Sequence, residues 1–295
     1  MPEKLLITGK SGFVGQHFVE YIRGTTDFEI IPVGAFSSEV GRVDYVIHLA
    51  AKTRIDDSIL HPREFLDANI IGTFDTLELA RKLPDLKKFV YFSTDEVFGP
   101  APEGAKFREW HRYNSSNPYA ASKAAGEELC LAWASTYSVP VIITHCQNLI
   151  GERQPAAKFL PTVVRAALTG GSVKVYADPD TGKPASRDYL HARDAASAVL
   201  FLLEKGQFRN KYNISANRAI SSLEVINQVG DILDVKIPFE MVSAANVRPG
   251  FSVRYGLDGS KLLHMGWKPL RSFEENLRST VAWMVATENR HWLMP

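Results

Sequence analysis

The chain has 295 residues, of which 45% are hydrophobic and 23% charged, and its formal net charge is +1. This length allows a sizeable core and two lobes, and the near-balanced charge gives no bulk preference for nucleic acid or a membrane surface. The longest apolar runs have the length of strands, so no membrane span is expected. Met1–Lys4 leads directly into a strand-like run, so we expect no signal peptide. Cys130 and Cys146 lie in apolar segments and predict two free thiols in a cytoplasmic protein, with no metal site.

The first half of the chain alternates between strand and helix patterns. Short apolar runs predict strands, and the segments between them have helical periodicity. The expected strands are 4–8, 28–33, 43–49, 89–93 and 139–146, and the expected helices are 13–23, 62–82 and 118–137. This alternation predicts an α/β fold in which a doubly wound (Rossmann) parallel sheet has helices on both faces.

The second half of the chain is less regular. We expect helices at 192–204, 223–233 and 273–287, and strands at 211–214 and 238–242. This mixture predicts a smaller α+β lobe that caps the carboxyl ends of the sheet. Residues 1–146 are therefore expected to form a dinucleotide-binding domain and residues 147–295 mainly a substrate-binding lobe. Residues 187–212 are expected to pack back on the first domain.

A glycine-rich turn follows the first predicted strand. Gly9, Gly12 and Gly15 have the spacing G-x-x-G-x-x-G. The first glycine permits a tight turn, the second lets a pyrophosphate approach the backbone, and the third lets helix and strand pack closely. Because the next predicted helix begins at Phe13, which is followed by Val14, its amino end would face the phosphates. The motif predicts a dinucleotide cofactor.

The second predicted strand leaves the identity of that dinucleotide open. An acid usually ends this strand and binds the hydroxyls of the adenosine ribose. Here the strand ends in Val33-Gly34-Ala35-Phe36, with no acid before Glu39 and no arginine before Arg42. Neither NAD nor NADP is specified by this segment. The chain up to Val43 is also short, which predicts that a strand–helix unit is missing.

Two further motifs carry acid–base groups. The strand-like run Phe89–Phe92 leads to Asp95 and Glu96, and Tyr119 and Lys123 lie one turn apart on one face of a predicted helix. Adjacent strand residues point to opposite faces, so both acids can serve one substrate only if the chain turns directly after the strand. Neighbouring acids in a closed site can have different pKa values, as an acid–base pair requires. The set predicts proton and hydride chemistry at a carbinol carbon.

These motifs run in one order over nearly the whole chain and together resemble the extended short-chain dehydrogenase/reductase family. The triplet Thr94-Asp95-Glu96 is similar to that of its nucleotide-sugar 4,6-dehydratases. The matching segments are 8–15, 48–51, 69–73, 93–99, 116–123, 158–161, 187–190, 212–214, 248–255 and 266–269. The resemblance implies an NAD-dependent lyase of deoxysugar biosynthesis. It would convert a nucleotide-linked hexose, of the dTDP-glucose or UDP-glucose type, into the 4-keto-6-deoxy sugar.

The resemblance also implies catalytic roles. Tyr119 would take the proton of the sugar C4 hydroxyl while hydride leaves C4, and Lys123 would lower the pKa of Tyr119 and hold the nicotinamide ribose. Thr94 would hydrogen-bond the C4 oxygen. Glu96 would remove the C5 proton, which is acidic once C4 is a ketone, and Asp95 would protonate the leaving C6 hydroxyl. Hydride would then return to C6.

Binding residues follow from the same resemblance. Cofactor contacts would come from Gly9, Gly12, Phe13, Val14, Gly15, Leu49, Ala50, Ala51, Asn69, Ser93, Tyr119 and Lys123. Substrate contacts would come from Thr53, Thr94, Asn148, Lys158, Arg187 and Arg248. The two arginines suit a diphosphate because guanidinium groups make charge-assisted, bidentate contacts. The helices near 62–82 and 118–137 would pair in a homodimer.

Two alternatives to the dehydratase remain at this level. One is a C4 epimerase or 4-ketosugar reductase on the same fold, which would not need the two acids at 95 and 96. The other is a nucleotide-binding scaffold without turnover, which the short adenosine-side segment favours. The sequence leaves the base and the hexose open.

Overall fold

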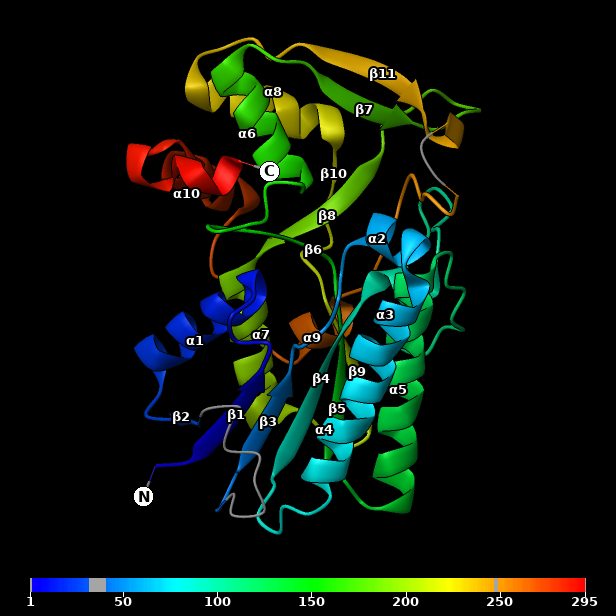
Figure 1. Cartoon of the computed structure of the whole chain (residues 1–295), viewed down its shortest axis with the longest axis vertical. Helices are drawn as coiled ribbons and strands as arrows, with labels where there is room; N and C mark the ends of the chain where they lie inside the picture. The colour runs from blue at the N-terminus through cyan, green and yellow to red at the C-terminus, as the bar shows by residue number, and fades with distance from the viewer. Residues whose placement is uncertain (1, 32–40, 247–248, 295) are drawn as a thin grey trace.

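The computed structural model describes residues 2–31, 41–246 and 249–294. Its centre is a six-stranded parallel sheet with the order β2-β1-β3-β4-β5-β9. Figure 1 shows helices on both faces of this sheet, so the predicted doubly wound α/β fold is confirmed. The strands are β1 (Lys4–Thr8), β2 (Glu29–Ile31), β3 (Tyr45–His48), β4 (Lys88–Thr94), β5 (Val141–Cys146) and β9 (Asn210–Ile214).

Two helical layers bury the sheet. On one face, α1 (Phe13–Thr25) and α7 (Ala192–Lys205) share a core with β1, β3 and β9. On the other face, α4 (Gly72–Ala80) and α5 (Pro118–Thr136) cover β4 and β5. Strands that are buried on both faces need apolar side chains in both directions, which explains the uninterrupted apolar runs of the sequence. Each fully buried Phe or Val side chain contributes about 1.5–3 kcal/mol to this packing.

The segment predicted as one helix over 62–82 is divided in the structure. It consists of α3 (Pro62–Leu66), a π-helical turn (Asp67–Ile71) and α4, which ends at Ala80. A short helix that was not predicted, α2 (Ile55–Leu60), precedes it. The π-helical turn carries Asn69, whose buried amide binds the backbone of Lys52. Apolar periodicity does not register such a tertiary contact.

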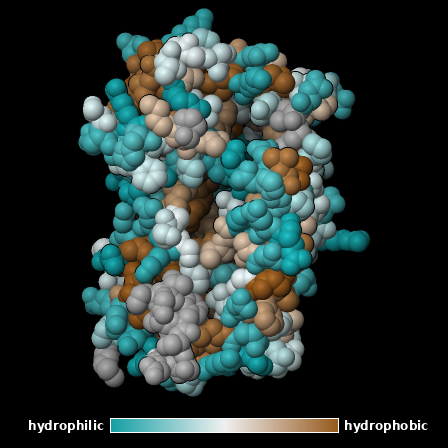
Figure 2. Space-filling model, viewed as in Figure 1, coloured by the Kyte–Doolittle hydropathy of each residue, from teal (hydrophilic) through white to brown (hydrophobic). Residues whose placement is uncertain are grey.

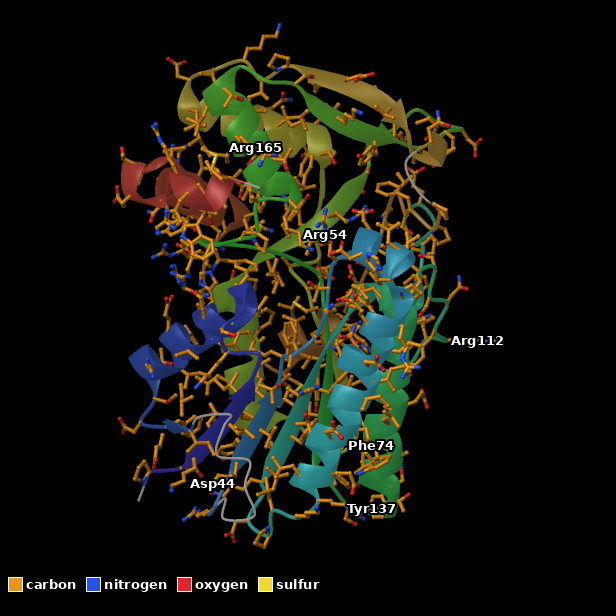
Figure 3. The ribbon with its side chains drawn as sticks, viewed as in Figure 1. Asp44, Arg54, Phe74, Arg112, Tyr137 and Arg165 are labelled. Carbon is orange, nitrogen blue, oxygen red and sulfur yellow. The ribbon has the colours of Figure 1, made fainter. Side chains whose placement is uncertain are left out.

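The adenosine side of the sheet is short, as predicted. Within the described ranges, β2 pairs only with β1 and forms the edge of the sheet. Residues 32–40, which include Glu39, lie outside the described part of the chain, and residues 41–44 enter β3 without helix or strand. Arg42 binds Asp44 at 2.7 Å (Nη2 to Oδ1), and Asp44 lies at the lower end of the sheet in Figure 3. Arg42 therefore lies away from the carboxyl ends of the strands.

The second half of the chain forms the upper lobe of Figure 1 around a separate core. Short strands make two small sheets, and three helices pack on them. The strands are β6 (Asn148–Ile150), β7 (Val173–Ala177), β8 (Ser186–His191), β10 (Ala219–Ser221) and β11 (Phe239–Ser243), and the helices are α6 (Phe159–Thr169), α8 (Ser222–Leu233) and α10 (Phe273–Val285). The sequence patterns predicted α8, α10 and β11 but missed the other strands and α6. The same half also supplies α7, β9 and α9 (Ser260–His264) to the lower part of the molecule.

Helix α5 supports the region where the two halves meet. Its 19 residues begin at Pro118, and the side chain of Asn117 caps it by accepting a 2.8 Å hydrogen bond from the Ala120 N–H. The cap fixes the first turn, which carries Tyr119. Among the helices of the described ranges, none is both long and apolar enough to cross a membrane.

Candidate active site

The glycine-rich turn lies at the carboxyl end of β1 and has no room for side chains at two positions. Gly9 has φ +71°, and a Cβ there would lie 2.7 Å from the backbone N of Ala50. A Cβ on Gly15 would lie 2.2 Å from the carbonyl oxygen of Gly9. Gly12 precedes α1 and gives it no side-chain cap. The N–H groups of Phe13 and of the next residues of this first turn are therefore available to an anion.

The end of β3 is fixed beside this turn. The Thr8 hydroxyl lies 2.8 Å from Nδ1 of His48 and accepts a 3.2 Å hydrogen bond from the N–H of Ala50. Leu49 N–H donates to the carbonyl of Thr8 at 3.3 Å. Leu49, Ala50 and Ala51 thus follow β3 at the same edge of the sheet as the glycines, where their backbone can contact a dinucleotide.

The buried side chain of Asn69 holds the segment that follows β3 through hydrogen bonds with Lys52. Its Oδ1 accepts a 2.8 Å hydrogen bond from Lys52 N–H, and its Nδ2 donates to Lys52 O at 3.0 Å and to Ser122 Oγ at 2.9 Å. The side chain is only 1% exposed. These contacts position the segment that follows Ala51. The geometry therefore favours a supporting role for Asn69 over a direct contact with the cofactor.

The chain turns directly after β4, as the two acids require. Thr94 ends the strand, and residues Asp95–Phe98 form a 3₁₀ helix that is followed by Gly99 with φ +74°. The Thr94 hydroxyl accepts a hydrogen bond from Glu96 N–H at 3.3 Å and donates to Oδ1 of Asp95 at 3.1 Å. This turn brings both acids to the carboxyl end of the sheet.

The two acids differ in their surroundings. Asp95 is buried, and burial together with the charge of Glu96 raises the pKa of Asp95 to about 7, although the Arg187 guanidinium opposes the shift. Glu96 is half-buried, and its Oε2 accepts hydrogen bonds from Asn117 Nδ2 at 3.0 Å and from the Tyr255 hydroxyl at 3.2 Å. Asp95 therefore retains a proton near neutral pH, while the carboxyl group of Glu96 is held by two hydrogen-bond donors.

Tyr119 lies in the first turn of α5 and is buried against the same acids. Burial and the charge of Glu96 raise the pKa of Tyr119 above its usual value, although a hydrogen bond with the Thr94 hydroxyl opposes the shift. Burial outweighs the contributions that lower this pKa, and the role expected for Lys123 stays a prediction. The Lys123 ammonium lies 4.1 Å from the centroid of the Tyr91 ring, and burial lowers the pKa of Lys123 to about 8.

A buried polar network that sequence reasoning missed lies next to this lysine. Glu127, one turn beyond Lys123 on α5, is fully buried and accepts hydrogen bonds from four side chains, those of Ser93, Tyr113, His145 and Lys211. Burial raises the pKa of Glu127, but His145 and Lys211 outweigh it and bring the value to about 2. Ser93 thus points into the network. The i, i+4 spacing from Lys123 was the sequence signal for Glu127.

The predicted substrate residues lie on several elements around the region where the lobes meet. Figure 2 shows the surface hollowed between the lower and upper parts of the molecule. Thr53 is exposed before α2, and Arg54, next to it, lies at the level of this hollow in Figure 3. Asn148 begins β6 and is exposed, and Lys158 precedes α6. Arg248 lies outside the described residues.

Arg187, on β8, is held by the protein backbone. Its Nη1 donates to the carbonyls of Ser186 and Val253, both at 2.7 Å, and its Nη2 donates to Ser252 O at 2.6 Å. Its guanidinium lies 4.8 Å from the centroid of the Tyr255 ring. The structure thus uses Arg187 to hold residues 252–253 and to bring positive charge near the acids.

A second cluster of ionisable groups joins α1 to the upper lobe. His17, Glu152 and His191 lie within 4.8 Å of one another and are buried. Nδ1 of His191 accepts a hydrogen bond from Arg193 N–H at 3.0 Å, so its Nε2 carries the hydrogen and donates to Glu152 Oε2 at 3.1 Å. Arg193 binds the other oxygen of Glu152 at 2.7 Å. Both carboxylate oxygens of Glu152 therefore have protein partners.

Comparison with known proteins finds relatives that match nearly the whole chain. The model of the NAD dependent epimerase/dehydratase family matches residues 32–215. The chain is 33% identical to dTDP-glucose 4,6-dehydratase of Salmonella typhimurium, covering 98% of this chain and 94% of that protein. The Haemophilus influenzae dTDP-glucose 4,6-dehydratase is 34% identical, with 95% and 97% covered. The Salmonella alignment is longer than this chain, so that relative has segments that this chain lacks.

Solved structures agree with these matches. The structure of DesIV, a dTDP-glucose 4,6-dehydratase from Streptomyces venezuelae solved with NAD, has a TM-score of 0.86 and 28% identity and covers 99% of each chain. RMD from Pseudomonas aeruginosa, solved with NADPH, has a TM-score of 0.84 and 28% identity, also with 99% of each chain covered. The resemblance seen in the sequence motifs is confirmed, and the chain belongs to the NAD-dependent epimerase/dehydratase family.

Proposed function

We propose that the chain is an NAD-dependent nucleotide-sugar 4,6-dehydratase, a hydro-lyase that acts on a dTDP- or UDP-linked hexose. The observation that carries the proposal is that Asp95, Glu96 and Tyr119 converge at the carboxyl end of β4, with a protonated acid beside a held carboxylate. Curated relatives about 30% identical over nearly the full length carry this activity in their names. Epimerisation at C4 alone needs neither acid.

The cofactor site fits a dinucleotide. The closely packed Gly9 and Gly15 and the uncapped amino end of α1 leave backbone N–H groups for a pyrophosphate, which only glycine at these positions permits. Gly12, Phe13 and Val14 would hold the phosphates, and the backbone after β3 would lie along the ribose. When bound, NAD supplies the hydride acceptor for C4, the hydride donor for C6, and a positive charge that lowers the pKa of a nearby phenol.

Tyr119 and Thr94 act at C4 of the sugar. The Tyr119 oxygen removes the proton of the C4 hydroxyl, and the Thr94 hydroxyl hydrogen-bonds the oxygen that becomes the ketone. Lys123 keeps a positive charge behind the tyrosine, over the Tyr91 ring. The burial of all three side chains excludes water, which strengthens each of these interactions.

Glu96 and Asp95 act at C5 and C6. The ketone at C4 acidifies the C5 proton, and the Glu96 carboxylate removes it. Asp95 donates its proton to the C6 hydroxyl, which leaves as water across the C5–C6 bond. The raised pKa of Asp95, about 7, supplies the protonated form that this step requires.

The substrate lobe would bind the rest of the molecule. Asn148 and Lys158 lie at the starts of β6 and α6, where they would contact the sugar and the diphosphate, and Thr53 would approach from the opposite side. Arg248 remains a proposed diphosphate ligand on sequence grounds, and Arg187 would contribute its charge from the backbone site described above. In this division, residues 1–146 bind the dinucleotide, α7 and the start of β9 within 187–212 pack back on that domain, and the remainder, with β8, mainly binds the nucleotide sugar.

A homodimer through the outer helices of the sheet domain is part of the proposal. Leu66, Ile71 and Phe74 are 42%, 51% and 39% exposed on the layer formed by α3 and α4. Figure 3 shows Phe74 on α4 and Tyr137, which follows α5, below it at the lower end of the molecule. Pairing with a second copy would bury these side chains. Cys130 and Cys146 are free and buried, which supports a reducing, cytoplasmic location.

The test is a reaction with defined substrates. The purified protein, with added NAD, is incubated with dTDP-glucose and with UDP-glucose, and the products are analysed by mass spectrometry. The proposal expects a sugar nucleotide lighter by one water and no net consumption of NAD. A C4 epimer of unchanged mass would instead support an epimerase. Absence of any product together with absence of NAD affinity would support a scaffold without turnover.

A further inference from the structure

The carboxylate of Glu96 is held on one of its two oxygens. Asn117 Nδ2 and the Tyr255 hydroxyl both donate to Oε2, at 3.0 and 3.2 Å. Within the described residues, no hydrogen bond reaches Oε1. The two donors therefore orient the group, and none of the described residues donates to its other oxygen.

Tyr255 reaches Glu96 on a segment from the far end of the chain, residues 250–257, which we call the crossing segment. On one side the carbonyl of Val253 accepts a hydrogen bond from Ser186 N–H of the upper lobe at 3.0 Å. On the other side Ala101 N–H donates to Arg254 O at 3.0 Å, and Phe107 N–H donates to Gly256 O at 2.9 Å. The crossing segment thus binds the upper lobe and the loop after β4 at the same time.

The position of Tyr255 on this segment is tightly determined. Its side chain is 5% exposed and is covered by the Arg187 guanidinium, which itself binds the carbonyls of Ser252 and Val253. The segment begins at Gly250, with φ +72°, where a Cβ would lie 2.1 Å from Ser116 O. Ser116 is next to Asn117 in the chain. The close approach of Gly250 to Ser116 therefore places the segment that carries Tyr255 beside the residue that supplies the other donor to Glu96.

We propose that Tyr255 is a positioning residue for the base of the elimination step. Its hydroxyl occupies Oε2 of Glu96, together with Asn117, so that Oε1 is the oxygen that receives the C5 proton. Because Tyr255 arrives on the crossing segment, the base is in place only when the upper lobe is docked on the sheet domain. This inference rests on the proposed dehydratase function and names a residue outside its catalytic set.

The kinetic test compares Tyr255→Phe with Tyr189→Phe. Both changes remove one hydroxyl from a buried tyrosine of the upper lobe, but Tyr189 packs against Phe273 and is not among the side chains that contact Glu96. We expect Tyr255→Phe to lower kcat about tenfold with KM within about twofold, because the change affects proton transfer and not binding. C4 oxidation should persist, so reduced nicotinamide should accumulate during turnover, and exchange of the C5 hydrogen with solvent deuterium should slow.

A second measurement does not depend on turnover. In a thermal double-mutant cycle, Tyr255→Phe should lower Tm by about 2 °C in the wild-type background and by clearly less in Glu96→Ala, where this acceptor is absent. Equal Tm effects in both backgrounds would overturn the inference, as would a kcat for Tyr255→Phe equal to that of Tyr189→Phe. If the wild-type protein converts no nucleotide-hexose, the proposed function fails, whereas the cycle still decides whether Tyr255 holds Glu96.

Discussion

The Thr94 hydroxyl donates a 3.1 Å hydrogen bond to Oδ1 of Asp95, the next residue in the chain. The contact joins the last residue of β4 to the first residue of the 3₁₀ helix and turns the acid back toward the strand end. Along β4, neighbouring side chains point to opposite faces of the sheet. After this hydrogen bond the chain turns, so that neighbouring side chains can reach the same site. Asp95 and Tyr119 share this threonine as a neighbour.

The pH dependence of turnover should follow Asp95. Since burial raises the pKa of Asp95 to about 7 and the proposed step needs the protonated form, kcat should fall as the pH rises above about 7. Asp95→Asn should lower kcat by about 100-fold or more and remove this limb. The measurement is kcat against pH between 5.5 and about 9 for both proteins; an unchanged limb in the variant would assign it to another group.

Asp95 should also make folding stability depend on pH. Its pKa is higher in the folded state than in the unfolded chain, so folding favours the protonated form. The resulting cost is absent below about pH 4 and grows as the pH rises to about 7. Asp95→Asn should therefore raise Tm relative to the wild type by about 2 °C or more at pH 8, with a smaller difference at pH 4. A difference that does not change with pH would contradict the raised pKa.

Glu96→Gln should separate oxidation from elimination. The amide keeps the size of the side chain and can still accept from Tyr255, but it cannot remove a proton. The variant should bind the nucleotide sugar with an affinity within about threefold of wild type and lose exchange of the C5 hydrogen with solvent deuterium by about 100-fold or more. NMR of the recovered sugar measures the exchange, and retained exchange would assign the base to another residue.

Gly15→Ala should impair cofactor binding because a Cβ at this position would lie 2.2 Å from the Gly9 carbonyl. We expect the affinity for NAD, measured by calorimetry, to fall about tenfold or more. Gly24→Ala is the matched control in the same helix, since a Cβ there meets no atom within 4 Å. The control should keep the affinity for NAD and gain up to about 1 kcal/mol of stability from helix propensity.

Glu127→Gln should destabilise the fold. Glu127 accepts from four donors, three of which are buried, and a neutral amide would leave Lys211 without its carboxylate partner. A loss of roughly 3 kcal/mol in the free energy of unfolding is expected. The pKa of Glu127 is lowered to about 2 in the folded state, so the advantage of the carboxylate is full above about pH 4.5 and shrinks toward pH 2.

Urea denaturation at pH 7 measures this loss, with Glu128→Gln as the control. Glu128 is the next residue of the helix and is exposed, so its substitution should change the free energy of unfolding by less than about 0.5 kcal/mol. Equal effects of the two substitutions would mean that the buried network contributes nothing beyond helix packing.

The proposed dimer should dissociate when charge is placed on its apolar face. Ile71 is 51% exposed in the π-helical turn, and Ile71→Asp should give a monomer in light scattering coupled to gel filtration. Leu270→Asp places the same charge at a residue that is 53% exposed in the other half of the chain, and it should leave the mass unchanged. A wild-type monomer at micromolar concentration would exclude the dimer.

Sequence patterns predicted the parts of the fold that depend on local periodicity. β1 and α5 were predicted at almost their observed bounds, because apolar runs and the Asn117–Pro118 start identify them. The π-helical turn was not predictable in this way, because its Asn69 binds Lys52, a residue distant in sequence. Among the strands of the upper lobe that were not predicted, β6 and β10 have three residues each, which are too few to establish a period.

The residues of the candidate site likewise differ in whether local sequence motifs identify them. Asp95, Glu96 and Tyr119 are recognisable because their spacing within short motifs reflects chemistry. Tyr255 is not, and Glu127 has only its i, i+4 spacing from Lys123 as a signal, because the importance of both residues comes from partners that lie far away in the chain. The position of Lys123 has the same origin, since its helical spacing from Tyr119 does not reveal that the ammonium lies over Tyr91.

The position of β9 at the outside of the large sheet has a consequence for biosynthesis. This strand pairs with β5 but is made only after β6, α6, β7 and β8 of the upper lobe, and the crossing segment follows later still. A nascent chain that has emerged as far as β5 would expose an unpaired parallel edge, with Glu96 still lacking Tyr255. Fragments that stop before residue 257 should therefore be prone to aggregate.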